Sequence, residues 1–209
     1  MTEYEIVSLI ISGLGLISLI LVIIQITISI RQSKKQHEEL RRVKTVEVLY
    51  NWNNGLKKET RLAEKIVEKF DEKQCINLYE YIPFTVTEDM HRMLCQMCSQ
   101  NDGKTNCDRC QPDSRGMYLV EGYRLNELRG NVTKYLNNLE IMALAWQQAI
   151  VDRDAIEEQF SFLHNPGKKS ALDNYRKIAG GGKSYPMTSE FYEQIKQNYS
   201  KRVKRKEEQ

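Results

Sequence analysis

The segment IVSLIISGLGLISLILVIIQITISI, residues 6–30, decides the fold class of this chain. It carries no charged side chain and consists mostly of Ile, Leu and Val. A helix of about 20 apolar residues spans the hydrocarbon core of a bilayer, so this segment is predicted to form a transmembrane helix. The residues before it lack the basic start of a signal peptide, and the apolar run is too long for one, so we expect the helix to stay on the protein.

The charges on either side of the segment predict its orientation. Glu3 and Glu5 precede it, whereas cations follow it closely. Because cytoplasmic flanks of membrane helices collect Lys and Arg, residues 1–5 are predicted to be extracytoplasmic and the chain after residue 30 cytoplasmic. Cations beside a membrane also attract anionic lipid headgroups, which accounts for this cluster better than nucleic-acid binding does. The cations are Arg31, Lys34, Lys35, Arg41, Arg42 and Lys44.

Small and polar side chains recur within the apolar segment at steps of three and four residues. Such steps place them on one face of a helix, with an average repeat of about 3.5 residues. Helices in lipid associate through small residues and polar hydrogen bonds, so this face is predicted to mediate self-association or to line a pore. A lone helix would also tolerate them, because Ser can bond back to its own helix and Gln25 lies near the membrane interface. The stripe comprises Ser8, Ser12, Gly15, Ser18, Val22, Gln25 and Ser29.

The remainder of the chain is predicted to be all-α, with a helical bundle over residues 31–200 and a charged tail over residues 201–209. The membrane helix is expected to continue into the cytoplasm until the Asn-Asn-Gly sequence at residues 53–55. No stretch alternates convincingly between apolar and polar residues, and the prolines stand at apparent boundaries. The longest helical pattern covers residues 117–150. Its predicted buried residues are Leu119, Leu125, Leu128, Val132, Tyr135, Leu136, Leu139, Met142, Ala143, Trp146 and Ile150.

Four cysteines in CQMCSQNDGKTNCDRC, residues 95–110, predict a metal site. They form two Cys-x-x-Cys pairs around a polar loop, and four thiolates are a ligand set that structural zinc prefers. Disulfides are not expected for cysteines bunched in a cytoplasmic protein. A redox-active dithiol and a site in which His91 replaces one cysteine are the alternatives. The predicted cofactor is therefore one structural zinc ion in a small knuckle, bound by Cys95, Cys98, Cys107 and Cys110.

Three patterns that resemble enzyme motifs fail on inspection. AGGGKS, residues 179–184, ends like a phosphate-binding loop, but Lys177 stands where that motif needs Gly and no strand is expected before it. The three histidines lie in separate helical contexts and suggest no serine–histidine–acid set. Glu157 and Glu158 are expected on a solvated helix face. No catalytic residue and no small-molecule substrate are predicted.

The layout of the chain resembles a bacterial family of membrane-anchored helical proteins catalogued as a domain of unknown function. The similarity lies in one N-terminal span, the basic exit RQSKKQHEELRR (31–42), the pair Trp52-Asn53, and RLNELRGNVTKYLNNLEIMALAW (124–146). The layout is also similar to the membrane accessory protein of type VI-B CRISPR systems, a divergent relative of HEPN helical domains. This second resemblance implies a HEPN-like bundle at the bacterial inner (cytoplasmic) membrane that assembles into a pore and enhances RNA-guided antiviral defence. The cysteine cluster belongs to neither pattern.

HEPN ribonucleases carry an Arg that is followed, four to six residues later, by a His. Arg124 and Arg129 have no His at that spacing, and Asn131 and Asn138 are the nearest polar substitutes. An amide cannot exchange protons as an imidazole does. The resemblance therefore implies a degenerate domain, in which Arg124, Arg129 and Asn131 are candidate contacts for RNA or for assembly.

Two functions from different classes follow from these patterns. The first is a non-enzymatic membrane effector that self-assembles into a pore, with copies of itself, the lipid bilayer and a CRISPR effector or its RNA as partners. The alternative is a membrane-tethered RNA-binding or degenerate HEPN ribonuclease domain. A monomeric anchored scaffold is a third possibility. The polar stripe favours the first function, because neither a tethered nuclease nor a scaffold needs one.

Overall fold

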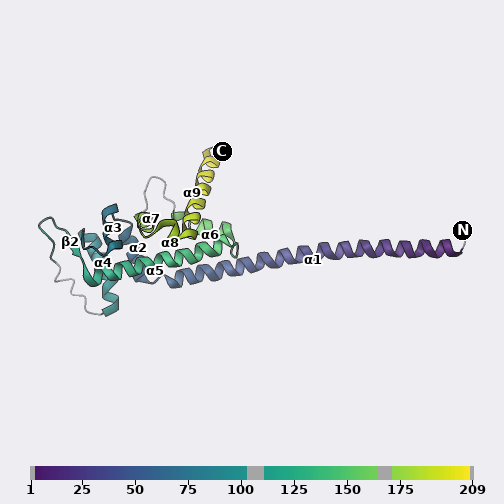
Figure 1. Ribbon diagram of the computed structural model, residues 1–209, viewed down its shortest axis with the longest axis horizontal. Helices are drawn as coiled ribbons and strands as arrows, with labels where there is room; N and C mark the ends of the chain where they lie inside the picture. Colours follow the sequence, from purple (N-terminus) through teal and green to yellow (C-terminus); the bar gives the residue numbers. More distant parts are fainter. Residues whose placement is uncertain (1–2, 103–110, 164–170, 208–209) are drawn as a thin grey trace. The chain divides into compact units, whose positions relative to one another are not determined.

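The computed structural model describes residues 3–102, 111–163 and 171–207 of the chain (Figure 1). The chain is mostly helical, as predicted, and it divides into two compact units, Met1–Lys44 and Thr45–Gln209. The boundary between the units lies beyond the predicted end of the membrane segment at residue 30, so the cation-rich exit belongs to the first unit.

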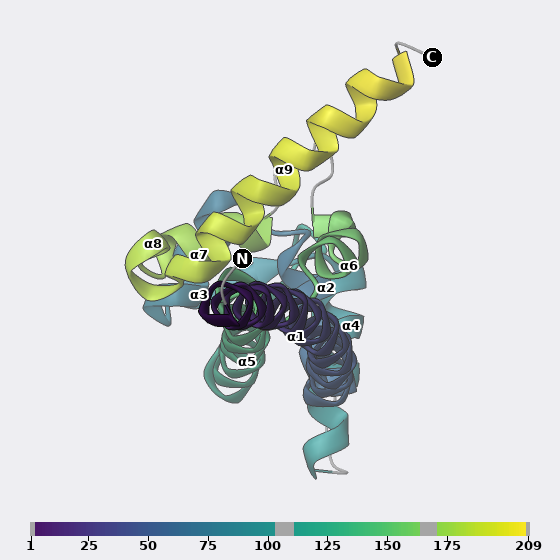
Figure 2. The same ribbon diagram turned by 90° about the vertical axis from the view of Figure 1, so that its right-hand side faces the viewer.

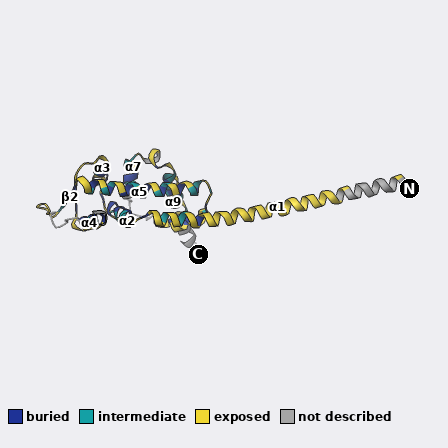
Figure 3. Cartoon of the chain, turned by 90° about the horizontal axis from the view of Figure 1, so that it is seen from below, coloured by how far each residue is buried: buried dark blue, intermediate teal, exposed yellow. Residues whose placement is uncertain are grey.

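Helix α1 spans Glu3–Gly55 and ends at the Asn-Asn-Gly sequence, which confirms the predicted end. From Ile17 onward it contains the one stretch, among the described residues, that is long and apolar enough to cross a membrane, with a mean hydropathy of 1.4. The large apolar residues from Ile17 to Ile30 are exposed at positions all around the helix; Ile24, for example, is 48% exposed, and this part of α1 has the colour of exposed residues in Figure 3. A helix that is apolar all round requires an apolar environment.

The unit Thr45–Gln209 is built from helices that surround its longest described helix, α5, at Gly122–Gln147. Within it α5 packs against α2 and α9, and α2 packs against α4. Helices α7 and α8 lie beside the beginning of α9 (Figure 2). The helices around α5 are α2 (Lys58–Val67), α3 (Glu72–Glu80), α4 (Glu88–Asp102), α6 (Arg153–Gln159), α7 (Ala171–Ile178), α8 (Gly181–Ser184) and α9 (Pro186–Glu207), with a 3-10 helix at Ser161–Leu163.

The buried stripe predicted for the long helix is confirmed between Leu125 and Trp146. Its two ends are not: Leu119 and Ile150 are exposed. The chain is extended at Leu119, before α5 begins, and it leaves the helix after Gln147, so neither end residue follows the helical repeat that would have buried it.

A small antiparallel ladder qualifies the all-α prediction. Strand β1 (Phe84–Val86) pairs with β2 (Tyr118–Val120), and Thr85 stands opposite Leu119. Phe84 and Val86 are buried, which is the alternation expected of a strand with one face on a core. Each strand has three residues, too few to register as a period of two in the sequence.

Aromatic rings fasten the last turns of α1 to the domain core. The Trp52 ring packs edge-on against Tyr135 of α5, at 5.5 Å between centroids, and against Phe160, at 5.0 Å. Phe160 in turn meets Phe191 of α9 at 5.8 Å. The Thr45 hydroxyl accepts a hydrogen bond from the Asp152 backbone N–H (2.7 Å). Residues 45–55 of α1 are therefore part of the domain.

Local capping sets several helix starts. Asp71 and Gln74 form a capping box at α3, in which the Asp71 carboxylate accepts from the Gln74 N–H (2.7 Å) and the Gln74 side chain accepts from the Asp71 N–H (3.1 Å). The Asp152 carboxylate accepts from the Ala155 N–H at the start of α6 (3.2 Å).

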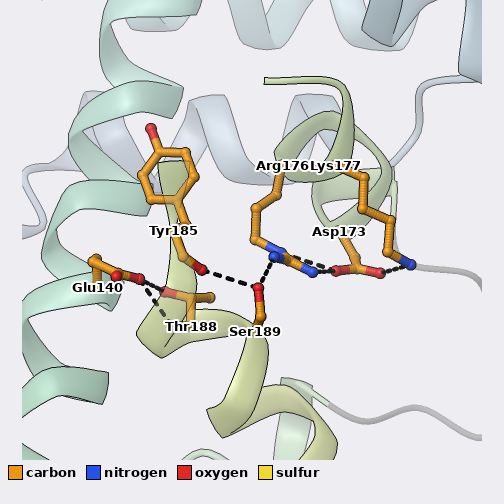
Figure 4. Close-up of polar contacts among 7 residues, drawn as sticks. All are labelled: Glu140, Asp173, Arg176, Lys177, Tyr185, Thr188 and Ser189. Carbon is orange, nitrogen blue, oxygen red and sulfur yellow. Dashed lines mark hydrogen bonds and ion pairs between the residues drawn. The ribbon is translucent and has the colours of Figure 1, made fainter. Parts of the chain in front are cut away.

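Helix α9 is capped from another helix instead (Figure 4). Glu140 of α5 accepts hydrogen bonds from the backbone N–H groups of Met187 (2.9 Å) and Thr188 (2.8 Å), and from the Thr188 hydroxyl (2.6 Å). The first N–H groups of a helix have no partner within it and carry partial positive charge, so a carboxylate satisfies and stabilises them. This contact fixes the start of α9 on α5.

A second polar cluster in Figure 4 joins α7 to α9. Arg176 is buried and donates to Asp173 from Nε (3.0 Å) and Nη2 (2.7 Å), and to the Ser189 hydroxyl from Nη1 (2.5 Å). Lys177 pairs with the other Asp173 oxygen at 2.6 Å. Burial by itself would raise the pKa of Asp173, but hydrogen bonds from Lys177 and Arg176 outweigh it and lower that pKa. The buried charge is thus fully compensated.

Candidate functional site

The predicted polar stripe lies on α1, and its described members are exposed. Gly15, Ser18, Val22, Gln25 and Ser29 all face the surroundings, and a Cβ added at Gly15 would meet nothing within 4 Å. The side chains of Ser8 and Ser12 lie outside the described residues. This face of the helix is therefore open to whatever surrounds it, as are the apolar faces beside it.

Two polar side chains of α1 differ in how their hydrogen-bonding groups are satisfied. The Thr27 hydroxyl donates to the Ile23 carbonyl of its own helix (2.8 Å), so it needs no other partner in lipid. Gln25 makes no side-chain hydrogen bond to any residue in the part of the chain that the structure describes. At about 100° per residue these two side chains lie on opposite sides of the helix. The Gln25 amide thus requires a hydrogen-bonding partner from outside the described residues.

Two of the four predicted zinc ligands lie in the described residues, on α4. Cys95 and Cys98 stand on this helix, which continues to Asp102. Cys98 is buried in the domain core and Cys95 is half-buried. Cys95 is disulfide-bonded in this structure, so the expectation of no disulfide in this cluster is wrong for Cys95. Cys107 and Cys110 lie outside the described residues.

No three metal-binding side chains converge among the residues that the structure describes, so the zinc site remains a prediction. One neighbouring side chain has the chemistry of a ligand. His91 Nε2 lies 3.6 Å from Cys95 Sγ, one helical turn away on α4. A redox-formed disulfide and a zinc thiolate site are alternative states of the same cysteines, and metal analysis distinguishes them.

His91 is buried and stacked on Tyr118, with 4.1 Å between ring centroids and 13° between planes. Burial and the nearby guanidinium of Arg124 lower the pKa of His91, which favours the neutral imidazole. Arg124 Nη1 lies 3.5 Å from His91 Nε2. Arg124, predicted as a contact for RNA or assembly, is therefore half-buried against a ring of its own domain.

Arg129 is held by two tyrosines at the end of α3. Its guanidinium carbon lies 3.8 Å from the Tyr81 ring centroid and 5.4 Å from that of Tyr79, which are cation–π distances. Tyr81 ends α3 in the left-handed conformation (φ 58°), where its N–H bonds to the Asn77 carbonyl. Tyr79 and Tyr81 are exposed. The arginine was a predicted contact residue, whereas the aromatic rings that position it were not predicted.

The amides of Asn131 and Asn138 have structural partners. Asn131 is buried; its Oδ1 accepts from the Thr60 hydroxyl of α2 (3.3 Å) and its Nδ2 donates to the Glu127 carbonyl (3.0 Å). Asn138 lies against the end of α1, since a Cβ added at Gly55 would come within 3.1 Å of its Oδ1. The candidate contact Asn131 is thus turned into the domain, where it joins α5 to α2.

Glu157 is buried, so the expectation of a solvated face is wrong for this residue, although Glu158 is exposed. The Glu157 carboxylate accepts hydrogen bonds from Trp146 Nε1 (3.0 Å) and from the Asn198 amide. A cavity of about 20 Å³ beside it, lined also by Ser161, Ile195 and Tyr199, has room for one water molecule. An indole N–H and an amide N–H satisfy this carboxylate, and neither is near it in sequence.

The sequence that ends like a phosphate-binding loop does not form one. Helix α7 precedes the segment 179–184, where the motif requires a strand. The last four residues of the segment form the short helix α8. The rejection of that motif is confirmed.

Comparison with known proteins gives no relative for this chain. No protein-family model, no curated protein and no solved structure matches it. Its function has to be inferred from its own residues.

Proposed function

We propose that the protein is a single-span membrane protein that self-associates through the polar stripe of α1 and forms a pore or another membrane-perturbing assembly. Gln25 is the observation that carries this proposal. Transfer of an amide into an apolar environment without a hydrogen bond costs about 2 kcal/mol or more. Another copy of the same helix presents an identical amide at the same depth, so self-association satisfies it.

The surroundings of Gln25 support a contact between helices. Val22 and Ser29 are one turn away on the same face and are smaller than the Ile residues beside them. Interhelical hydrogen bonds in membranes contribute about 0.6 to 2 kcal/mol each, and small side chains allow the close approach that they need. A ring of such helices would place the amides around a lumen, where polar side chains line pathways for water and ions.

The orientation belongs to the same proposal. Glu3 and Glu5 stand before the apolar stretch and a dense group of cations stands after it, so the N-terminus faces outward and the domain is cytoplasmic, at the bacterial inner membrane. In line with the resemblance, the domain would receive the signal from a CRISPR effector or its RNA. We assign no catalytic residue to it.

A tethered RNA-binding domain is the second candidate, because one observation favours it. Tyr81 and Tyr79 are exposed aromatic rings within cation–π distance of the Arg129 guanidinium. Proteins that bind single-stranded RNA use aromatic rings and Arg planes as stacking platforms. This platform could bind RNA with no chemistry at the site.

The first test is release of ions and dye from liposomes that contain the full-length protein. We expect release by the wild type and its loss in Gln25→Leu. Thr27→Val is the matched control: it removes a polar group in the same stretch, but one already bonded within its own helix. Equal release by wild type and Gln25→Leu would refute a role for the stripe, and tight vesicles with the wild type would favour RNA binding.

Structural zinc, bound by Cys95, Cys98, Cys107 and Cys110, is a separate part of the proposal. Purified protein from zinc-replete cells is expected to hold about one ion per chain, since four thiolates bind one metal. Cys107→Ser with Cys110→Ser should abolish it, and these positions are preferable to Cys98, which is in the core. If His91 replaces one cysteine, a single Cys→Ser variant would retain the metal. Absence of metal from reduced protein would leave the disulfide as the state of this site.

A further inference from the structure

The part of α1 that follows the apolar stretch has two chemically different sides. Counted at about 100° per residue, its cations Arg31, Lys34, Lys35, Arg41 and Arg42 fall within an arc of about 120°. The opposite side, which we call the exit face, carries no Lys or Arg between residues 31 and 43. The exit face comprises Gln32, Gln36, Leu40, Val43 and Tyr50.

The large apolar residues of the exit face are strongly exposed. Leu40 is 58% exposed, Val43 63% and Tyr50 66%. In residues 45–55, the side of α1 that the domain covers bears Thr45 and Trp52, and Leu56, the residue after the helix, is buried. At about 100° per residue that covered side is opposite to Tyr50. Tyr50, the member of the exit face that lies within Thr45–Gln209, is therefore not used by the core of that unit.

The exit face also continues the polar stripe of the apolar segment. Along a helix with about 3.6 residues per turn, Ser18, Val22, Gln25 and Ser29 fall in the same arc as Leu40 and Val43. Helical hydrogen bonding runs without interruption from Glu3 to Gly55, so one helix carries both. A single face thus changes from polar residues, in the apolar stretch, to apolar residues, beyond it. In lipid, helices associate through small and polar residues, whereas in water they associate through apolar residues. Each part of this face therefore carries the residue type that favours association in its own surroundings.

We propose that the exit face is the contact surface for α1 of a second copy of this chain, packed in parallel. This inference rests on the proposed self-association and extends it from the membrane into the cytoplasm. Copies inserted in one membrane by the same rule point the same way, so their α1 helices are parallel. Contact through the exit face keeps the five cations of each helix on its outer side, away from those of its neighbour.

The charges that border the exit face fit a parallel partner. Glu39 lies at one edge of the face and Lys44 at the other. If Leu40 and Val43 take the core positions of a coiled coil, Glu39 and Lys44 take the flanking positions that pair between parallel helices. The glutamate of one copy then lies beside the lysine of the next.

Photo-crosslinking of the full-length protein in membranes tests this surface. A benzophenone amino acid at position 43 is expected to give a covalent dimer, and the same residue at position 42, on the cationic side, is expected to give none. The control differs by one position, so folding and depth are matched. Equal yields at positions 42 and 43, or crosslinks from position 43 to lipid only, would overturn the proposal.

A third crosslinker, at Val22, separates this inference from the proposed function. Dimers from position 22 but not from position 43 would overturn the exit face and retain association in the membrane. Dimers from position 43 but not from position 22 would support the exit face alone, and absence of both would overturn both.

A charge exchange gives an independent readout of register. Glu39→Lys alone is expected to reduce the dimer from position 43, because it places two cations side by side, and Glu39→Lys with Lys44→Glu is expected to restore it. Failure of the double variant to recover, when the single variant loses the dimer, would exclude the parallel pairing.

Discussion

The two longest described helices, α1 and α5, differ in how their apolar residues are arranged. In α5 one stripe of apolar residues is buried from Leu125 to Trp146 against α2, α9 and the end of α1, whereas Ile141 and Leu144, off this stripe, are exposed. In the apolar stretch of α1 apolar residues cover every side and none of those described is buried. One buried apolar stripe, as in α5, is thus typical of a helix that packs against other helices. An apolar surface all round, as in α1, is typical of a helix that requires an apolar solvent.

The sharpest way to test this contrast is to shorten one leucine in each helix. Leu136→Ala in α5 removes a fully buried side chain and should lower the free energy of unfolding of the domain by about 2 to 5 kcal/mol, through lost burial and a cavity. Leu21→Ala in α1 should change it by less than about 0.5 kcal/mol. Denaturant titrations of the detergent-solubilised protein, followed by Trp fluorescence, measure both. Similar losses would show that the apolar stretch supports the domain.

A smaller effect is expected where α5 caps α9. Glu140→Ala removes the acceptor of three hydrogen bonds and should cost about 1 to 3 kcal/mol, with faster hydrogen exchange at Met187 and Thr188. Glu193→Ala, which removes an exposed carboxylate further along α9, is the control. Unchanged exchange at these two N–H groups in Glu140→Ala would contradict the capping role.

The tyrosine pair that holds Arg129 should contribute less again. Arg129→Ala is expected to lower domain stability by about 0.5 to 1 kcal/mol, the usual range for a partly exposed cation–π contact. Arg42→Ala, on the cationic side of α1, should leave it unchanged. If Arg129 also binds RNA, a fluorescent single-stranded oligonucleotide would lose affinity in Tyr81→Ala as well. If affinity for the oligonucleotide falls in Arg129→Ala but not in Tyr81→Ala, the charge of Arg129 alone accounts for binding.

The smallest effect on stability near neutral pH is expected from the ionisation of the Cys75 thiol. Burial, followed by the charges of Asp71, Glu68 and Glu72, raises the pKa of this thiol to about 12. In the unfolded chain it ionises near its ordinary value of 9.0, so as pH rises past that value the unfolded state loses its proton first. This contribution to stability is therefore full below pH 9.0 and is lost toward pH 12.

The measurement is the difference in unfolding midpoint between the wild type and Cys75→Val at neutral and alkaline pH. Only the wild type has the stabilisation that depends on the Cys75 thiol. Its unfolding midpoint should therefore fall relative to that of Cys75→Val as the pH rises. A constant difference would place the thiol in a polar environment and contradict its burial.

Local signals in the sequence were sufficient for many features. The end of α1 at Gly55 and the buried stripe of α5 both depend on residues within a few turns of one another. The polar stripe and the cation-rich exit are of the same kind, because both are properties of one helix.

The features that the sequence analysis missed involve partners far apart in the chain. Glu140 caps α9 from 47 residues away, and Glu157 is satisfied by Asn198, 41 residues away. The ladder between β1 and β2 pairs segments of three residues across the cysteine-bearing region. None of these residues differs by type or spacing from an ordinary surface residue, so only packing reveals the role of each.

The sequence by itself therefore determined that this is a helical protein with one apolar stretch, an uncharged face along it and cations opposite, because solvent preference is fixed by side-chain type and helical period. Only the tertiary structure decided which charges are buried, which arginine is held by aromatic rings, and which side of α1 remains exposed once residues 45–55 have packed on the core. These depend on contacts between segments that fold together, and a linear pattern carries no record of which segments will meet.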